Sequence, residues 1–380
     1  MNRLKQKIIA FDYGIKNAII FFLRTLFYGR ISKITAQRIL VFRTGFVGDT
    51  VCALPAMHAI RNNFPNAEVD LLTKSDQKHS STLLDLVQSV KFNQVINYYG
   101  INKFPLFRQL TKRKYQVFID LTQYETSFWY QVRNMFYIKL LRIPKAFGWE
   151  MNKSNFFPQY QEKHTVFQNE RDRLLNLLRE NNLNAESEGP LLTIPDEIKE
   201  KIKNLFFKKG LTPKNKLIGL VIGSKRKRNK WPLEYFKEIV ENYIQQSCTV
   251  LLLGNDDDKI SSQQLAINKN VIDLCGTLSI LETAEIIHNC SIVISNDTGP
   301  MHLTYSVNTP LVAIFSARDF PDKWFPPVDQ KTSVFRSTDV LCSICINREC
   351  HDNVCMKKIK PAEIIEAADH ILKNEQDNAT

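Results

Sequence analysis

The sequence lacks several features that would define a membrane-spanning, secreted or repetitive protein. Its apolar runs, such as residues 18–23, fall far short of the roughly 18 residues that a membrane-spanning helix needs. No small-residue cleavage site follows the apolar N-terminal segment, which argues against a secretory signal. No internal repeat or low-complexity tract occurs. Neither a GxGxxG motif nor a Walker loop is present, so nucleotide sites of those kinds are not supported.

The composition is that of a globular protein with a basic excess. The chain has 380 residues, of which 44% are hydrophobic and 24% charged, and this argues against a mainly disordered chain. The length suggests two or three domains, each able to bury a core. The formal net charge of +12 favours anionic partners, whether phosphates, nucleic acid or a membrane surface.

The first tenth of the chain is both basic and apolar. Residues 1–38 carry eight basic residues and one acidic residue. Apolar residues recur at steps of three or four, which predicts a helix with an apolar stripe. The stripe consists of Leu4, Ile8, Phe11, Ile15, Ile19, Phe22 and Leu26. Such a helix fits the interface of an anionic inner leaflet; the alternatives are packing on its own protein and the face of a dimer.

The eight cysteines fall into two groups. Four are scattered singly in apolar surroundings and are expected to be small buried residues in a reducing compartment: Cys52, Cys248, Cys275 and Cys290. The other four form C-x2-C-x4-C-x4-C: Cys342, Cys345, Cys350 and Cys355. That spacing suits a small structural zinc knuckle. Reduced thiols and local disulfides are the alternatives, and a structural role is expected over a catalytic one.

From residue 38 onward short apolar runs alternate with amphipathic stretches, and this happens twice. Strands are predicted at 39–42, 69–73, 94–98, 117–120 and 146–148, and again at 217–222, 249–253, 271–274, 292–295 and 311–315. Strands that alternate with helices indicate parallel sheets. We therefore expect an α/β protein with two Rossmann-like domains facing a central cleft, and ligands at the carboxyl ends of the strands.

The domain boundaries are predicted from composition. The polar segment 181–189, followed by Pro190, is the expected place for the change of domain. The predicted parts are a basic amphipathic extension at 1–37, a first Rossmann-like domain at 38–185, a linker region at 186–212, a second such domain at 213–358, and a C-terminal helix at 359–380.

Two glycines and an aspartate follow the first predicted strand. Gly45 and Gly48 allow a close backbone approach, and a helix that begins there offers unpaired N–H groups. Asp49 lies near the start of that helix. A carboxylate in this position is commonly an N-cap; its alternative role is that of a general base.

Three turns in the second half carry further candidates. Asp297, Thr298 and Gly299 precede a predicted helix whose N-terminus is suited to bind phosphate. His302 lies about one turn into that helix, where it contacts a phosphate or sugar, or packs within the domain. Lys230 ends a basic run that follows a strand and is placed to reach an anion. The acidic residues at 256–258 end the next strand, where they bind a ribose diol or start a helix.

These pieces, in this order, resemble glycosyltransferase family 9, the ADP-heptose:lipopolysaccharide heptosyltransferases. The family pattern Arg-x-x-x-x-Gly-Asp is matched by residues 43–49, Lys-Trp-Pro by 230–232, and Asp-Thr-Gly-x-x-His by 297–302. Each motif is short, but their order and spacing together are fairly specific. The resemblance implies a GT-B fold, with the acceptor mainly on the first domain and the nucleotide sugar on the second.

The resemblance also implies an inverting transfer that needs no metal or other cofactor. Asp49 matches the proposed general base and Lys230 the lysine on the donor diphosphate. Thr298 and Gly299 match the phosphate cradle, Asp297 and His302 match residues that line the donor sugar, and Asp256 is the closest match to a ribose-binding acid, with Asp258 as its alternative. Arg43 and Gly48 are expected to bind the acceptor or a phosphate.

A bacterial enzyme of lipopolysaccharide core synthesis is thus expected, in the cytoplasm and peripheral on the inner face of the inner membrane. Its expected partners are a nucleotide sugar and a lipid-linked saccharide, with no nucleic acid. One alternative is a GT-B transferase for another surface glycan that uses a different nucleotide sugar. The other is a non-catalytic protein that binds anions or nucleic acid, against which stands the lack of an aromatic stacking platform.

Overall fold

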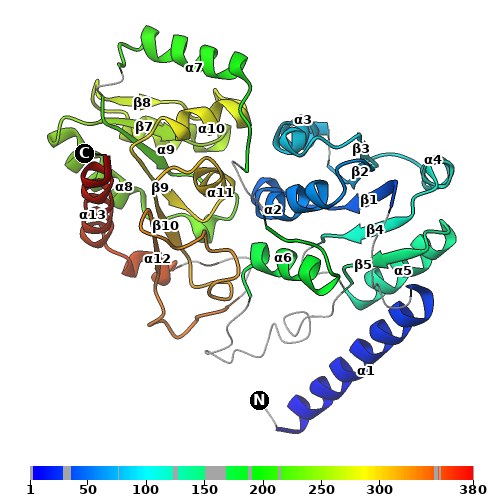
Figure 1. Ribbon diagram of the computed structural model, residues 1–380. Helices are drawn as coiled ribbons and strands as arrows, with labels where there is room; N and C mark the ends of the chain where they lie inside the picture. Colours follow the sequence, from blue (N-terminus) through cyan, green and yellow to red (C-terminus); the bar gives the residue numbers. More distant parts are fainter. Residues whose placement is uncertain are drawn as a thin grey trace. The chain divides into compact units, whose positions relative to one another are not determined.

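The computed structural model describes residues 3–28, 36–75, 77–122, 127–149, 168–186, 191–212, 215–345, 350 and 352–379. The chain divides into two compact units (Figure 1). Unit 1 comprises Met1–Gln161 and Glu170–Gly189, and unit 2 comprises Glu162–Asn169 and Pro190–Thr380. Each unit is built around its own parallel sheet.

The two units divide the chain differently from the predicted parts in four places. The predicted linker contains helix α7 (Asp196–Lys208), which belongs to unit 2 because it packs against helix α10 (Ile280–His288). The predicted C-terminal helix, α13 (Pro361–Ala379), also belongs to unit 2, where its buried face joins the core. The N-terminal extension folds with unit 1, and the short segment Glu162–Asn169 is assigned to unit 2.

Unit 1 is a five-stranded sheet in the order β3-β2-β1-β4-β5, and all its strands pair in parallel. Its strands are β1 (Arg38–Phe42), β2 (Glu68–Thr73), β3 (Gln94–Asn97), β4 (Val117–Asp120) and β5 (Lys145–Phe147). Its helices are α1 (Arg3–Tyr28), α2 (Val47–Asn63), α3 (Gln77–Val87), η1 (Gln88–Val90), α4 (Lys103–Arg113), α5 (Phe128–Leu140) and α6 (Glu170–Glu180). The central strands are nearly continuous apolar runs because helices cover both faces of the sheet.

Unit 2 is a six-stranded parallel sheet in the order β11-β10-β9-β6-β7-β8. Its strands are β6 (Leu217–Val221), β7 (Thr249–Leu253), β8 (Val271–Asp273), β9 (Ile292–Asn296), β10 (Leu311–Phe315) and β11 (Thr332–Arg336). Besides α7, α10 and α13, its helices are η3 (Lys227–Asn229), α8 (Leu233–Gln245), η4 (Asp256–Asp258), α9 (Lys259–Leu265), α11 (Gly299–Ser306) and α12 (Val354–Lys358).

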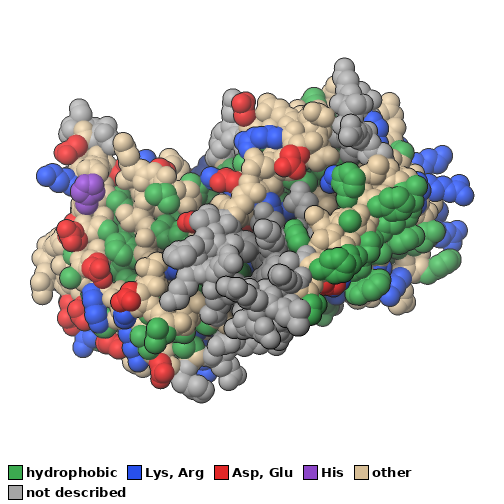
Figure 2. All heavy atoms as spheres, turned by 90° about the horizontal axis from the view of Figure 1, so that it is seen from below, with side chains coloured by type: hydrophobic (Ala, Val, Ile, Leu, Met, Phe, Trp, Pro, Cys, Tyr) green, Lys and Arg blue, Asp and Glu red, His purple; other side chains and the backbone are tan. Residues whose placement is uncertain are grey.

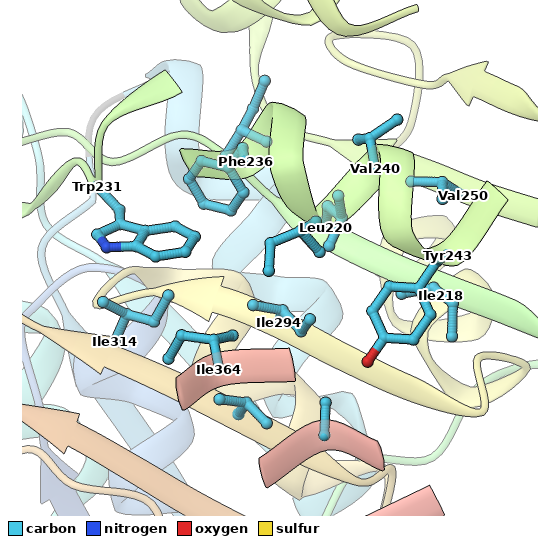
Figure 3. Close-up of a cluster of buried hydrophobic side chains, with 14 of the residues drawn as sticks. Ile218, Leu220, Trp231, Phe236, Val240, Tyr243, Val250, Ile294, Ile314 and Ile364 are labelled. Carbon is cyan, nitrogen blue, oxygen red and sulfur yellow. The ribbon is translucent and has the colours of Figure 1, made fainter. Parts of the chain in front are cut away.

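The core of unit 2 follows from the two-residue period of its strands. Alternate residues of the central strands, such as Ile218, Leu220 and Ile294, point to one face, where they meet Phe236 of α8 and Ile364 of α13 (Figure 3). The opposite face of β10 packs against α11. Layers on both faces hold the carboxyl ends of the strands in fixed positions, which is what the candidate site requires.

Helix α1 presents apolar residues on two sides. Ile20 and Tyr28 are buried in the core of unit 1, and the Tyr28 hydroxyl donates to the Met135 carbonyl of α5 at 2.7 Å. The predicted stripe is a different side of the helix: Phe11 is 71% exposed and Phe22 is 62% exposed. Figure 2 shows hydrophobic side chains gathered along α1, with Lys and Arg side chains beside them. Among the described residues, the apolar length of every helix falls short of a membrane span.

Candidate active site

Each sheet contains one point at which the strand order reverses. In unit 1 it lies between β1 and β4, and in unit 2 between β6 and β9. In open α/β sheets, ligands bind beyond the carboxyl ends of the strands at such a point. The predicted residues Arg43, Gly48 and Asp49 follow β1 in unit 1, whereas all the predicted donor residues follow strands of unit 2.

Asp49 is held by the turn that precedes α2. The Phe46 backbone N–H donates to Asp49 Oδ2 at 2.8 Å, so this carboxylate caps the helix. Gly45 has a φ of +152°, and a Cβ there would lie 2.6 Å from Asp49 Cβ, so the turn requires glycine. The other carboxylate oxygen, Oδ1, has no hydrogen-bond partner in the part of the chain that is described. Capping therefore occupies one oxygen of Asp49 and leaves the second for chemistry.

Arg43 and Gly48, which were predicted to bind the acceptor or a phosphate, are less accessible than that role requires. Gly48 is the second residue of α2 and is half-buried. The Arg43 side chain is buried; its Nη1 donates to the Leu121 carbonyl and to Glu170 Oε1, and its Nη2 donates to the Asp49 carbonyl. These contacts give Arg43 a structural role, because its two Nη atoms fasten the first turn of α2 to α6.

The structure reveals a buried charge network that the sequence analysis missed. Arg173 forms two hydrogen bonds with the Glu170 carboxylate, from Nε at 2.8 Å and from Nη2 at 3.0 Å. Arg43 contacts the same carboxylate at 3.2 Å. Burial alone would raise the pKa of Glu170, but the two arginines outweigh it and the pKa is lowered. The available signal was the Glu-x-x-Arg spacing at the start of α6, which places both charges on one helix face.

Asp120 is a second buried carboxyl at this edge, at the end of β4. Its Oδ1 accepts from the Thr122 hydroxyl at 2.6 Å and from the Thr122 N–H at 2.9 Å. Burial raises the pKa of Asp120 to about 6, although Thr122 and the charges of Arg173 and Arg43 oppose the shift. Asp120 therefore titrates close to the physiological range beside the loop that carries Asp49.

In unit 2 a set of polar side chains joins the ends of β6, β9 and β10. Asn296 accepts from the Trp231 N–H at 2.9 Å and donates to the Ile222 carbonyl at 2.8 Å. Asn229 donates to Asp297 Oδ2 at 2.7 Å and accepts from the Ser316 hydroxyl at 2.9 Å. These bonds fix the loop that carries Lys230 against the loop that carries Asp297, as a preformed ligand site requires.

Lys230 lies at this edge but is held by an acidic partner. Its Nζ is 2.7 Å from Asp258 Oδ1, and Asp258 is buried against Gly223, where a Cβ would lie 2.0 Å from its carboxylate. Asp258 is therefore unsuited to the ribose role that was its alternative assignment. Asp256 is exposed and pairs with Lys259 at 2.8 Å, so it is the better placed of the two acids.

Helix α11 begins directly after Asp297. Thr298 is its N-cap residue and makes no capping hydrogen bond with its side chain, and Gly299 is the first helical residue. The first turn of this helix therefore lacks a side-chain cap, as an anion-binding terminus would. His302 is buried one turn further on, with Nδ1 at 3.4 Å from the Tyr305 hydroxyl. Burial lowers the pKa of His302 to about 4, so this ring is neutral at pH 7.

The two groups of cysteines differ in burial. The four scattered ones are buried, and burial raises the pKa of the Cys248, Cys275 and Cys290 thiols. In the second group the Cys350 sulfur accepts from the Asn353 N–H at 3.3 Å, and Asn353 donates to the Lys230 carbonyl at 2.8 Å. The cysteine segment therefore supports the Lys230 loop. Within the described residues, no three His, Cys, Asp or Glu side chains are grouped so that they could hold a metal ion.

Comparisons with known proteins agree with this arrangement. The chain is 27% identical over 356 residues to lipooligosaccharide heptosyltransferase 2 of Campylobacter jejuni, with 89% of this chain and 99% of the relative covered. A family 9 glycosyltransferase structure from Veillonella parvula has a TM-score of 0.70 at 18% identity and covers 91% of this chain and 100% of its own. The structure of Escherichia coli ADP-heptose lps heptosyltransferase II has a TM-score of 0.65 at 20% identity and covers 89% and 99%.

The two parallel α/β units and this likeness define a protein of the GT-B fold. The family model "Glycosyltransferase family 9 (heptosyltransferase)" matches residues 104–355. The chain belongs to this family, and the resemblance seen in the sequence motifs is confirmed. The match contains the motifs at 230–232 and 297–302, whereas the motif at 43–49 precedes it.

Proposed function

We propose that the protein transfers a heptose from ADP-heptose to a lipopolysaccharide or lipooligosaccharide core, with inversion and without a catalytic metal. The observation that carries the reaction type is Asp49, a carboxylate fixed at the switch point of unit 1 with Oδ1 uncommitted. The names of the family and of its relatives support the sugar and the acceptor.

The reaction needs one base and one site for the leaving group. Asp49 Oδ1 accepts the proton of the acceptor hydroxyl while that oxygen attacks the anomeric carbon. The bond from this carbon to the diphosphate breaks, and ADP leaves with the electron pair. Lys230 and the uncapped start of α11 stabilise the charge that develops on the diphosphate. A single displacement inverts the anomeric centre and needs no second nucleophile.

The direct test is a transfer assay with ADP-heptose and a heptose-deficient core acceptor. We expect turnover in EDTA equal to turnover in magnesium, and calorimetric binding of ADP in preference to UDP and GDP. A preference for UDP or GDP would replace the proposed donor. Strict dependence on added metal would contradict the metal-free mechanism, and retention at the anomeric carbon would contradict the single displacement.

We also propose that the second cysteine group holds a structural zinc ion. The pKa of Cys355 is raised, mainly by burial and to a smaller extent by Cys342 and Cys350. Thiolates are the ligands that zinc prefers in structural sites, and binding would draw the sulfurs together. Metal analysis of protein purified without chelator should give about one zinc per chain. The C342S/C345S variant should lose it, and Cys248→Ser should not.

The exposed side of α1 is proposed to lie on the anionic inner membrane surface. Its apolar residues continue into Phe136 and Leu140 of α5, which are also exposed, and Phe27 packs on Phe136 with ring centroids 5.1 Å apart. The basic excess of residues 1–38 complements anionic lipid headgroups. This arrangement supports a peripheral enzyme on the cytoplasmic face, where a lipid-linked acceptor is presented.

Vesicle flotation tests the membrane proposal. The F11S/F22S variant should lose binding to phosphatidylglycerol vesicles, whereas Phe207→Ser, at an 83% exposed position on α7, should keep it. Neutral phosphatidylcholine vesicles should bind the wild type weakly. Equal binding by all three proteins would contradict the proposal, and dimers of the wild type that dissociate in F11S/F22S would identify α1 as a dimer face instead.

A further inference from the structure

Arg228 is a buried cation of unit 2 for which the described part of the chain shows no hydrogen-bond or ion-pair partner. It is the middle residue of η3 and only 6% exposed, while its neighbour Lys227 is exposed. Its Nε and Nη1 atoms are buried and have no hydrogen-bond partner among the described residues. Burying a charged group in this way is unfavourable unless an opposite charge or hydrogen-bond acceptors compensate it.

The surroundings increase this cost. Burial lowers the pKa of Arg228, and the charges of Arg318 and Arg226 lower it further. Cys345 and Cys350 act in the opposite direction and raise the pKa of Arg228. Of these two arginines, Arg318 pairs with Asp319 at 3.6 Å, whereas Arg228 itself pairs with no acid among the described residues.

The position of Arg228 relates it to the site of unit 2. The next residue in the chain, Asn229, forms hydrogen bonds with the side chains of Asp297 and Ser316, and Lys230 follows it. Arg318 lies just after β10, two residues beyond Ser316. The arginines thus belong to the same strand ends as the predicted donor residues, at the edge where ligands bind in this class of sheet.

We propose that Arg228, together with Arg226 and Arg318, binds a phosphoryl group of a substrate of this enzyme. A phosphate supplies the negative charge and the acceptor oxygens that Arg228 lacks, and the planar guanidinium suits it. The inference rests on the proposed function, and two sources share this chemistry. One is the diphosphate of the nucleotide sugar; the other is a phosphate on the saccharide acceptor.

Calorimetry with Arg228→Met, Arg228→Lys and the exposed control Lys227→Met separates the two sources. If the donor is the source, Arg228→Met binds ADP roughly 10-fold to 100-fold more weakly than the wild type does. Adenosine, which has no phosphate, then binds the variant and the wild type with the same affinity. If the acceptor is the source, ADP binding is unchanged, and the variant loses its preference in kcat/KM for a phosphorylated over a dephosphorylated acceptor. Arg228→Lys should retain part of either effect, and Lys227→Met should retain wild-type values.

Thermal unfolding distinguishes this role from a merely structural one. Pyrophosphate should raise the Tm of the wild type and of Lys227→Met but not that of Arg228→Met, because only a bound anion stabilises by mass action. Without anion, Arg228→Met should unfold at the wild-type temperature or above it, since an uncompensated buried charge has been removed.

Equal pyrophosphate shifts in all variants, or Arg228→Met with wild-type affinity for ADP and wild-type acceptor preference, would overturn the proposal. A lower zinc content of Arg228→Met with unchanged anion binding would also overturn it, because Arg228 would then serve the cysteine group. Failure of the wild type itself to bind ADP would count against the proposed donor, while the pyrophosphate and acceptor measurements would still decide the role of Arg228.

Discussion

At the carboxyl edge of the sheet in unit 1, two buried arginines pair with a carboxylate of the protein. At the matching edge of unit 2, one buried arginine has no acidic partner among the described residues. Arg43 and Arg173 are buried on the carboxylate of Glu170. Arg228 is also buried, at 6% exposed, but has no such partner among the residues that the structure describes. Compensation in unit 1 leaves a carboxylate oxygen of Asp49 exposed to chemistry, and the unmatched cation in unit 2 leaves a place for an anion.

This difference agrees with the division of labour in a glycosyl transfer. The acceptor side needs a base, and a base must keep an oxygen that no nearby cation neutralises. The donor side needs cations that can interact with a diphosphate, beyond the pairing of Lys230 with Asp258. The same topological position therefore supports two different chemical tasks, through the placement of charged residues in the loops.

The largest expected effect concerns the base. Asp49→Asn keeps the capping oxygen for the Phe46 N–H but removes the basic carboxylate. Transfer should fall by roughly 10²-fold to 10⁴-fold, with ADP affinity unchanged. Rate and calorimetric measurements with the exposed Asp329→Asn as control check this. Near-normal turnover of Asp49→Asn would reduce Asp49 to a helix cap and remove the contrast between the two edges.

The second effect is on stability and belongs to unit 1. Glu170→Gln leaves Arg43 and Arg173 buried without their counter-charge. The free energy of unfolding should fall by about 3–5 kcal/mol, because breaking one partner out of a buried pair leaves an uncompensated charge. Denaturant unfolding is the measurement, with the exposed Glu200→Gln as control, which should change by less than about 0.5 kcal/mol. A small loss for Glu170→Gln would mean that the network is open to water.

A third effect depends on pH and involves Asp120. Its pKa of about 6 exceeds that of an unfolded aspartate, so the folded state holds the proton more tightly. The resulting stabilisation is fully present below about pH 4 and is lost as the pH rises through 6. Asp120→Asn lacks this titrating group. The free energy of unfolding of the variant minus that of the wild type should therefore rise by about 2 kcal/mol between pH 4 and pH 7. Parallel pH profiles of unfolding for both proteins would contradict the assignment.

The smallest expected effect concerns Lys230, the cation of unit 2 that pairs with Asp258. Lys230→Met should weaken ADP binding by about 10-fold but also leaves Asp258 buried without its lysine. The double variant Lys230→Met/Asp258→Asn should recover the unfolding temperature and not the ADP affinity. Lys237→Met, on the exposed surface of α8, serves as control. Recovery of affinity in the double variant would make Lys230 a structural residue of unit 2.

Much of this architecture was readable from the sequence, and the failures have specific causes. Ten strands were predicted from apolar runs bounded by turns, because parallel strands buried on both faces leave that pattern. Strand β11 was missed because it is a half-buried edge strand without a continuous apolar run. The linker assignment failed at α7, since a helix whose packing partner lies about 80 residues away gives no local sign of it.

The N-terminal helix shows the same limit on a smaller scale. Periodicity predicted an apolar stripe, and Phe11 and Phe22 lie on an exposed side of α1. The sequence held a second apolar set that includes Ile20 and Tyr28, and nothing local indicated which set would pack. Only contact with α5 decided it, because burial is a property of two surfaces and periodicity describes one.

The sequence by itself determined the class of fold, the family and the loops that carry the site, because strand runs, turn residues and motif order are local properties. The tertiary structure alone decided which charged side chains pair within the protein and which can interact with a substrate. Arg43 and Arg228 both stand in loops that follow a strand. Arg43 pairs with Glu170, from a helix more than a hundred residues away, whereas the charges of two more arginines lower the pKa of Arg228. Pairing of buried charges depends on distances between segments remote in the chain, and folding alone sets those distances.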